Sequence, residues 1–160
     1  MERFTTIILQ YAVYAIGLIM FTVVSGITWW ASNILAINPV HTVIMIVLLV
    51  GLYMASIPFY IALFQAVKLL KCIETNCAFS EASVNALKII TRCIGAIFVI
   101  CSVVGLPFFY YWADLDDAPG LIIIGLGISG IIFIVAVFAS ILERIFREAF
   151  VAKSENDLTI

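Results

Sequence analysis

Apolar residues fill four long stretches of the chain, and short polar segments separate them. The first two stretches are so continuous that no Asp, Glu, Lys or Arg occurs between Phe4 and Val67. A helix needs about 20 mostly apolar residues to cross the hydrocarbon core of a bilayer. The pattern predicts spans over residues 5–30, 41–67, 93–112 and 121–142. The expected fold class is an all-α integral membrane four-helix bundle, a single transmembrane domain over residues 1–160.

Basic residues occupy alternate gaps between these stretches. One precedes the first span, four lie between the second and third, and three follow the fourth: Arg3; Lys68, Lys71, Lys88 and Arg92; Arg144, Arg147 and Lys153. Cytoplasmic loops retain Lys and Arg during insertion. The alternation therefore predicts a multi-pass protein of the bacterial cytoplasmic membrane, with its N-terminus and C-terminus in the cytoplasm. Trp29 and Trp30 suit the opposite interface, where aromatic rings anchor helices.

The overall composition supports the same class. Apolar residues make up 65% of the chain and charged residues 11%, and the mean hydropathy is +1.23. Soluble domains are about 45–50% apolar and about 25% charged. A soluble globular domain is therefore excluded. The basic residues are few and close to the membrane, so no direct binding of nucleic acid is expected.

Two polar regions outside the spans are expected to be helical in part. Residues 68–92 form a cytoplasmic corner in which Ser80 is a good N-cap and Glu81 suits the positive end of the helix dipole. The third helix should thus begin in the cytoplasm before it enters the bilayer. Residues 143–160 form a cytoplasmic tail in which Glu143 and Arg147 are spaced to pair.

Small residues and prolines carry further information on packing. Pro58 lies well inside the second span and predicts a kink, with Ser56 or a neighbouring helix as the partner for the backbone carbonyl that Pro58 leaves unpaired. Two spans carry stripes of small residues with one spacing: Gly51, Ala55, Ala62 and Ala66; Gly125, Ser129, Ala136 and Ser140. Such stripes let helix backbones approach closely. Packing within the bundle is the favoured interpretation, and an interface in a homo-oligomer or to another protein is the alternative.

The two halves of the chain resemble each other. Residues 16–19 read Ile-Gly-Leu-Ile and residues 94–97 read Ile-Gly-Ala-Ile, and both segments precede aromatic ends. Pro39 and Pro119 each open the second helix of their half. The matches suggest two repeated helical hairpins, threaded alike. Chance similarity between apolar sequences is the alternative.

Ionisable residues inside a membrane are functional candidates by default. The central parts of the four predicted spans contain none. Gln10 and Gln65 fall near the cytoplasmic ends of the first two spans, where they are expected to bond to each other. Four cysteines are present, but the cytoplasm is reducing, so no disulfide is expected.

Two further groups of polar residues are candidate binding sites. His41 with Asp114, Asp116 and Asp117 could bind a cation outside the membrane, although solvated loop residues explain the same pattern. Tyr53, Ser56 and Tyr60 form a polar stripe on the second span. Hydrogen bonds to neighbouring helices are the favoured reading of this stripe, and a pocket for a lipid or small apolar ligand is the alternative. No catalytic residue, cofactor or metal site is predicted.

Several segments resemble a known family. They are Pro58 and Tyr60, then Lys68-Leu69-Leu70, Phe79-Ser80 and Leu87-Lys88-Ile89. Together they resemble small bacterial membrane proteins catalogued as domain of unknown function 2975, although Cys77 stands where glycine or lysine is expected. The resemblance carries no catalytic residues. It implies a genomic association with small helix-turn-helix regulators of the Cro/repressor type, and hence a role in membrane-linked regulation.

The leading hypothesis is a non-enzymatic membrane protein that regulates a cytoplasmic protein, such as a small helix-turn-helix regulator. The candidate partner-binding residues are Lys71, Glu74, Glu81 and Lys88 of the corner, together with the C-terminal extension. One alternative is an oligomeric transporter or pore component, which liposome flux would reveal. Another is an immunity protein against a membrane-active peptide, which peptide sensitivity after gene deletion would reveal. A membrane enzyme is the least favoured class.

Overall fold

The computed structural model describes residues 2–37, 42–74 and 80–157, and almost all of them are helical. The helices are α1 (Glu2–Ile37), α2 (Thr42–Glu74), α3 (Glu81–Ile100), a π-helical turn η2 (Cys101–Gly105), α4 (Leu106–Leu115) and α5 (Gly120–Asp157). α3, η2 and α4 follow one another without a loop and together form the third crossing. In the described residues, four helical segments are long and apolar enough to span a membrane, which confirms the predicted fold class.

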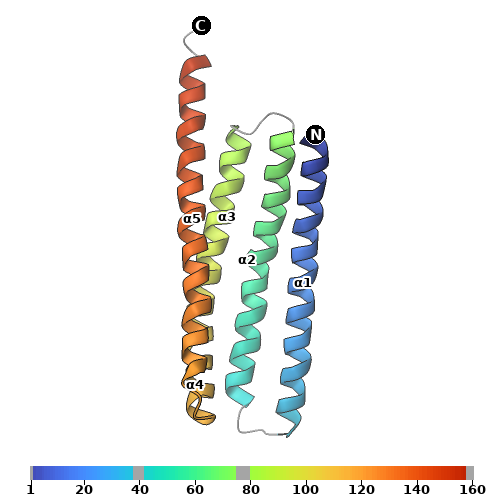
Figure 1. Ribbon diagram of the computed structural model, residues 1–160, viewed down its shortest axis with the longest axis vertical. Helices are drawn as coiled ribbons and strands as arrows, with labels where there is room; N and C mark the ends of the chain where they lie inside the picture. Colours follow the sequence, from blue (N-terminus) through green and yellow to red (C-terminus); the bar gives the residue numbers. More distant parts are fainter. Residues whose placement is uncertain (1, 38–41, 75–79, 158–160) are drawn as a thin grey trace.

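The crossings form a row in the order α1, α2, α3, α5, and neighbours run in opposite directions (Figure 1). α2 packs against α1 on one side and α3 on the other, and α5 packs against α3 and α4. The start of α1 and the end of α5 lie at the same end of the row (Figure 1). Two hairpins, α1–α2 and α3–α5, are therefore threaded alike, while duplication of their sequences stays a prediction.

The side walls of the molecule are apolar. Few large side chains are buried, and Met45 is the largest that is fully enclosed. Large apolar residues such as Tyr11, Phe64 and Ile123 are each more than 70% exposed. Lipid tails are as apolar as a protein core, so this surface is stable only in a bilayer.

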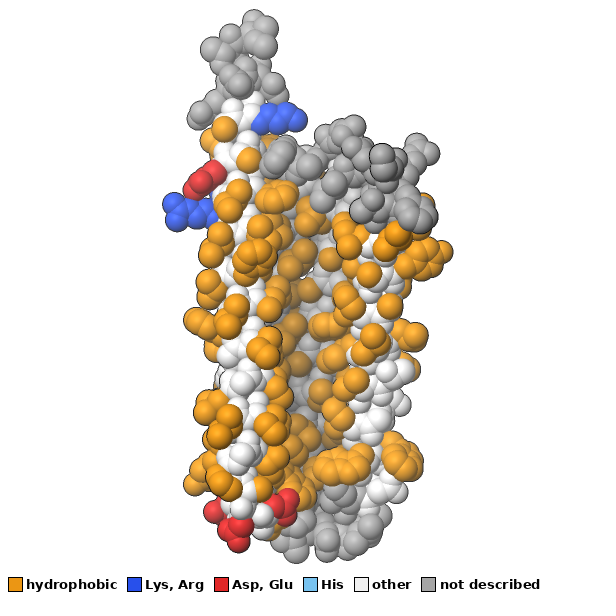
Figure 2. Space-filling view, viewed as in Figure 1, with side chains coloured by type: hydrophobic (Ala, Val, Ile, Leu, Met, Phe, Trp, Pro, Cys, Tyr) orange, Lys and Arg blue, Asp and Glu red, His pale blue; other side chains and the backbone are white. Residues whose placement is uncertain are grey.

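The charged residues are sorted to the two ends of the row. Figure 2 shows Lys and Arg side chains near the C-terminal end of α5 and a group of acidic side chains at the opposite end. Asp114 lies in the last turn of α4, Asp116 and Asp117 lie in the tight turn before α5, and all three are exposed. Asp117 has φ of 49°, a left-handed conformation that Asp tolerates better than most residues. His41, the fourth residue of the candidate cation site, lies outside the described residues.

Local signals in the sequence explain two helix features. The Ser80 hydroxyl accepts a hydrogen bond from the Ser83 backbone N–H at 3.3 Å, which confirms Ser80 as the N-cap of α3. α2 continues as a helix through Pro58. The Ser56 hydroxyl donates to the carbonyl of Leu52 at 2.8 Å, so it does not satisfy the Met54 carbonyl that Pro58 leaves without its usual donor.

Candidate functional site

The end of the row that contains the C-terminal part of α5 and its Lys and Arg side chains is called the basic end. The predicted partner-binding residues lie at this end but on two different faces. Lys71, in the last turn of α2, is exposed and lines a groove between α2 and α1. Glu81 is exposed in the first turn of α3, and Lys88 is half-buried two turns further on. α3 packs on the side of α2 away from α1 (Figure 1). Glu74 ends α2, and its side chain lies outside the described residues.

The C-terminal part of α5 is the second element of the predicted docking region. It carries two ion pairs along its own axis, Arg144 Nε to Glu148 Oε1 and Arg147 to Glu143 Oε1, both at 2.8 Å. The second pair confirms the predicted contact between Glu143 and Arg147. The Arg144 and Glu148 side chains are 82% and 64% exposed, so their pair is worth little in stability. They provide a charged helical face in water.

A π-helical turn interrupts the third crossing between Cys101 and Gly105. Pro107 follows in the first turn of α4, within the continuous helical run, so its missing N–H removes one backbone hydrogen bond just after the π-turn. The apolar pattern of the sequence does not reveal this turn. Its available signal was the combination of Gly105 and Pro107, because π-turns form where the regular hydrogen-bond ladder is broken, often at functional positions.

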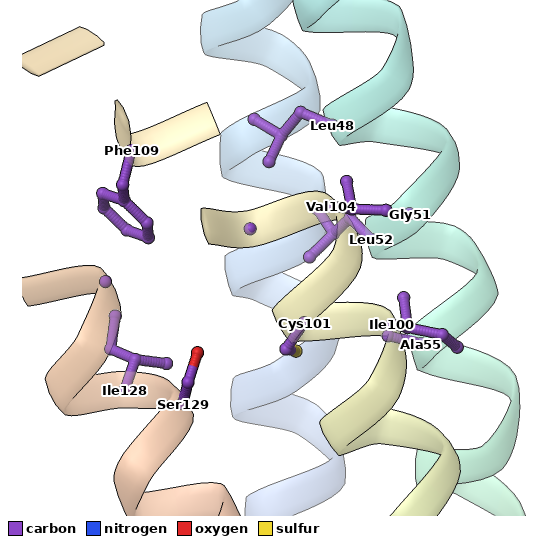
Figure 3. Close-up of a pocket in the computed structure, with 12 residues that line it drawn as sticks. Leu48, Gly51, Leu52, Ala55, Ile100, Cys101, Val104, Phe109, Ile128 and Ser129 are labelled. Carbon is purple, nitrogen blue, oxygen red and sulfur yellow. The ribbon is translucent and has the colours of Figure 1, made fainter. Parts of the chain in front are cut away.

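The π-turn borders a cavity of ≈ 110 Å³ between α2, the third crossing and α5 (Figure 3). Its walls are almost wholly apolar, and the Cys101 thiol and Ser129 hydroxyl are its polar side-chain groups. A water molecule in such a space needs two to four polar partners. The lining therefore favours a small apolar occupant over water, and it presents no pair of groups suited to acid–base or nucleophilic chemistry.

Two glycines bring their helices close to the third crossing beside this cavity. A Cβ atom added at Gly51 would lie 2.6 Å from Val104 Cγ1, and one added at Gly125 would lie 2.7 Å from Phe109 Cδ2. Ala55 and Ser129, the next members of the two small-residue stripes, are buried as well. These contacts support packing within the bundle for this part of the stripes. The exposed Ser140 does not take part.

The polar stripe on α2 faces α1. The Tyr60 hydroxyl donates to the Gly17 carbonyl at 3.2 Å, and the Tyr53 hydroxyl shares a hydrogen bond with Thr28 Oγ1 at 3.1 Å. These bonds confirm that Tyr53 and Tyr60 bond to a neighbouring helix. They also cross the floor of two adjoining depressions between α1 and α2 that share Phe21 and Tyr60.

The expected bond between Gln10 and Gln65 is not formed. Gln65 Oε1 is buried and accepts no hydrogen bond from any residue that the structure describes. At the other end, α1 and the third crossing meet through the rings of Trp30 and Trp112, whose centroids are 6.5 Å apart. No group of three or more His, Cys, Asp or Glu able to hold a metal occurs within residues 2–37, 42–74 and 80–157.

The fold defines the class of the protein: it is all-helical and has four helical segments that are able to cross a membrane. The cavity beside the π-turn is lined almost wholly by apolar side chains. Comparison with known proteins identifies the family within this class. Residues 29–160 match the family described as protein of unknown function (DUF2975). The chain belongs to this family. It is also 42% identical over 161 residues to the uncharacterized membrane protein YoaS of Bacillus subtilis (strain 168), with all of both chains covered. No solved structure matches the chain.

Proposed function

We propose that this protein is a non-enzymatic membrane component that binds and regulates a cytoplasmic protein, such as a small helix-turn-helix regulator. The proposal places the basic end of the row, with both termini, in the cytoplasm, because Lys and Arg are retained on that side during insertion. Binding would hold the soluble partner at the membrane and limit its access to its other targets.

The observation that carries the proposal is the extension of the C-terminal end of α5 beyond the adjacent ends of the other helices (Figure 1). Its 38 residues extend for about 57 Å at 1.5 Å per residue. The hydrocarbon core needs about 20 of them, so close to half of the helix stands outside it. Figure 1 shows this end of α5 rising past the adjacent ends of the other helices. A membrane anchor alone does not require such an extension.

The chemistry of this end suits a protein partner. Exposed charges of both signs, on Arg144 and Glu148, lie next to Ile145, which is 52% exposed. The Thr91 hydroxyl of α3 donates to the Ala139 carbonyl of α5, which fixes the relative height of these two antiparallel helices. Glu81 and Lys88 of α3 therefore lie at about the same height along the row as the charged part of α5. Mixed charges around an apolar centre are typical of a specific, reversible interface. The opposite end offers a tight turn and a single sign of charge.

Co-purification in mild detergent tests the proposal. The chain is isolated from native membranes as wild type and with Lys71, Glu74, Glu81 and Lys88 replaced by Gln or Ala, and bound soluble proteins are identified by mass spectrometry. A matched control replaces Asp114, Asp116 and Asp117 by Asn at the other end. The proposal requires a soluble partner that the control retains and the four-residue variant loses. Equal recovery by both variants, or recovery of no soluble protein, contradicts it.

A further inference from the structure

A groove runs along one side of the α1–α2 pair, and its inner half extends from Tyr60 to Lys71. This half has a volume of ≈ 600 Å³ and is walled by side chains of both helices. α2 is the main packing partner of α1, and the described residues that line this half of the groove all belong to these two helices. Its rims are large rings: Tyr14 is 64% exposed, Phe21 64% and Phe64 71%.

The absence of a side chain at Gly17 helps to form this groove. A Cβ there would already lie 3.4 Å from Leu63 Cδ1 and 3.8 Å from Tyr60 Cε1. Gly17 also leaves its carbonyl open to the Tyr60 hydroxyl, which donates to it at 3.2 Å. That bond satisfies both polar groups. The groove wall below it therefore presents apolar surface until Lys71 is reached.

The length of this half matches one leaflet. Tyr60 and Lys71 are eleven residues apart on α2, which is about 16 Å along the axis. The hydrocarbon core is about 30 Å thick, so one leaflet contributes about 15 Å. A fatty-acyl chain lying in the groove with its ester end at Lys71 would reach the tyrosine near the bilayer midplane.

Basic residues at the Lys71 end of the groove favour a lipid with an anionic head group. Lys71 lines the groove itself, and Lys68 is exposed one helical turn before it. Arg3 lies in the first turn of α1 at the same end of the row. Basic side chains at this depth attract anionic lipid. We infer that the groove is a binding site for an anionic phospholipid of the leaflet at the basic end, with one acyl chain between α1 and α2 and the phosphate at Lys71.

A second copy of the chain is a poorer occupant. Two copies inserted with one topology carry their basic ends at the same leaflet, so docking in this groove would bring like charges together around Lys71. A phospholipid instead supplies an anion at that level and an apolar chain below it. The groove shares Lys71 with the proposed partner-binding residues. Lipid binding to the purified chain needs no cytoplasmic partner, however, and does not depend on which leaflet faces the cytoplasm.

Native mass spectrometry of the full chain tests the site, with phosphatidylglycerol and phosphatidylcholine of identical acyl chains added in equal amounts. We expect retained adducts of phosphatidylglycerol on the wild type. The Lys71→Gln variant should hold about fivefold less, the change expected for one basic residue near lipid head groups. Gly17→Leu, which fills the groove, should lose adducts of both lipids. Lys153→Gln and Gly127→Leu are matched controls, because Lys153 is outside the groove and a Cβ at Gly127 meets nothing within 4 Å.

The outcomes separate the occupants. Equal retention of the two lipids by the wild type, or unchanged phosphatidylglycerol binding in Lys71→Gln, overturns the inference. Dimers in place of lipid adducts, abolished by Gly17→Leu, would assign the groove to a second copy and overturn it too. Lys71 is exposed, so its variant keeps the test decisive even if Gly17→Leu does not fold.

Discussion

Gly51 on α2 faces Val104 in the π-turn so closely that a Cβ at position 51 would lie 2.6 Å from Val104 Cγ1. Real side chains do not tolerate that distance, so the contact depends on glycine. The π-turn is thereby held against α2 on one side. Gly125 plays the same part for Phe109 on the side of α5.

Replacing Gly51 by Ala should destabilise the fold by about 1–3 kcal/mol, the usual penalty for an overpacked core. Gly127→Ala is the control, because its Cβ enters open space and Ala is the better helix former by about 1 kcal/mol. Denaturant titration in detergent micelles, followed by circular dichroism, measures both. The double variant Gly51→Ala, Val104→Ala should recover much of the loss, since the two residues share one contact. A Gly51→Ala protein as stable as the control would show that the helices can separate freely here.

Gln65→Leu should raise stability by about 1–3 kcal/mol, because Gln65 Oε1 is buried without a hydrogen bond from the described residues. Leucine has a similar size and leaves no polar atom to desolvate. The same titration compares Gln65→Leu with Gln10→Leu. Gln10 is half-buried, but its amide oxygen is not a buried atom without a hydrogen bond. A loss of stability in Gln65→Leu would reveal a polar partner for this side chain.

Tyr60→Phe should lower stability by about 0.6 kcal/mol, the average for hydrogen bonds between membrane helices. Stability is lost because phenylalanine cannot replace the hydrogen bond that the Tyr60 hydroxyl donates to the Gly17 carbonyl. Tyr110→Phe is the matched control, because that side chain is 64% exposed and its hydroxyl forms no hydrogen bond with another helix in the part of the chain that the structure describes. Infrared spectroscopy with a labelled Gly17 carbonyl gives a second readout, and an unshifted band in the variant would contradict the bond.

Topology can be measured with single cysteines in a variant whose four native cysteines are replaced. Asp116→Cys should react with an impermeant maleimide added to intact cells, since the α4–α5 turn is expected outside. Glu155→Cys should react only after the cells are opened. The reverse pattern would place the basic end, and the proposed docking surface, outside the cytoplasm.

Much of this architecture follows from linear patterns. The spans were predictable because each crossing must be apolar over its whole length, which a single stretch of residues reveals. Ser80 was predictable as a cap because its hydroxyl serves a backbone group three residues away. Glu143 and Arg147 were predictable as a pair for the same reason of local spacing.

The predictions that were wrong, and the features that were not predicted, depend on contacts between residues far apart in the sequence. Gln10 and Gln65 lie at similar depth, but depth does not specify the direction in which a side chain points around its helix. Lys71 was grouped with Glu81 and Lys88 by proximity in the chain, whereas α2 carries Lys71 towards α1. Gly105 and Pro107 were the local signal for the π-turn, but its packing against α2 depends on Gly51 of another helix, which no local pattern reveals.

Hydropathy and charge along the chain were thus enough to establish the number of apolar helical segments and the sorting of charges to two ends. A bilayer imposes these one segment at a time, through the high free energy of unpaired polar groups in hydrocarbon. Which faces of the helices meet is a different matter, because lipid and protein surfaces are equally apolar and the choice rests on close contacts between particular side chains. The row of helices, the cavity beside the π-turn and the α1–α2 groove arise from those contacts.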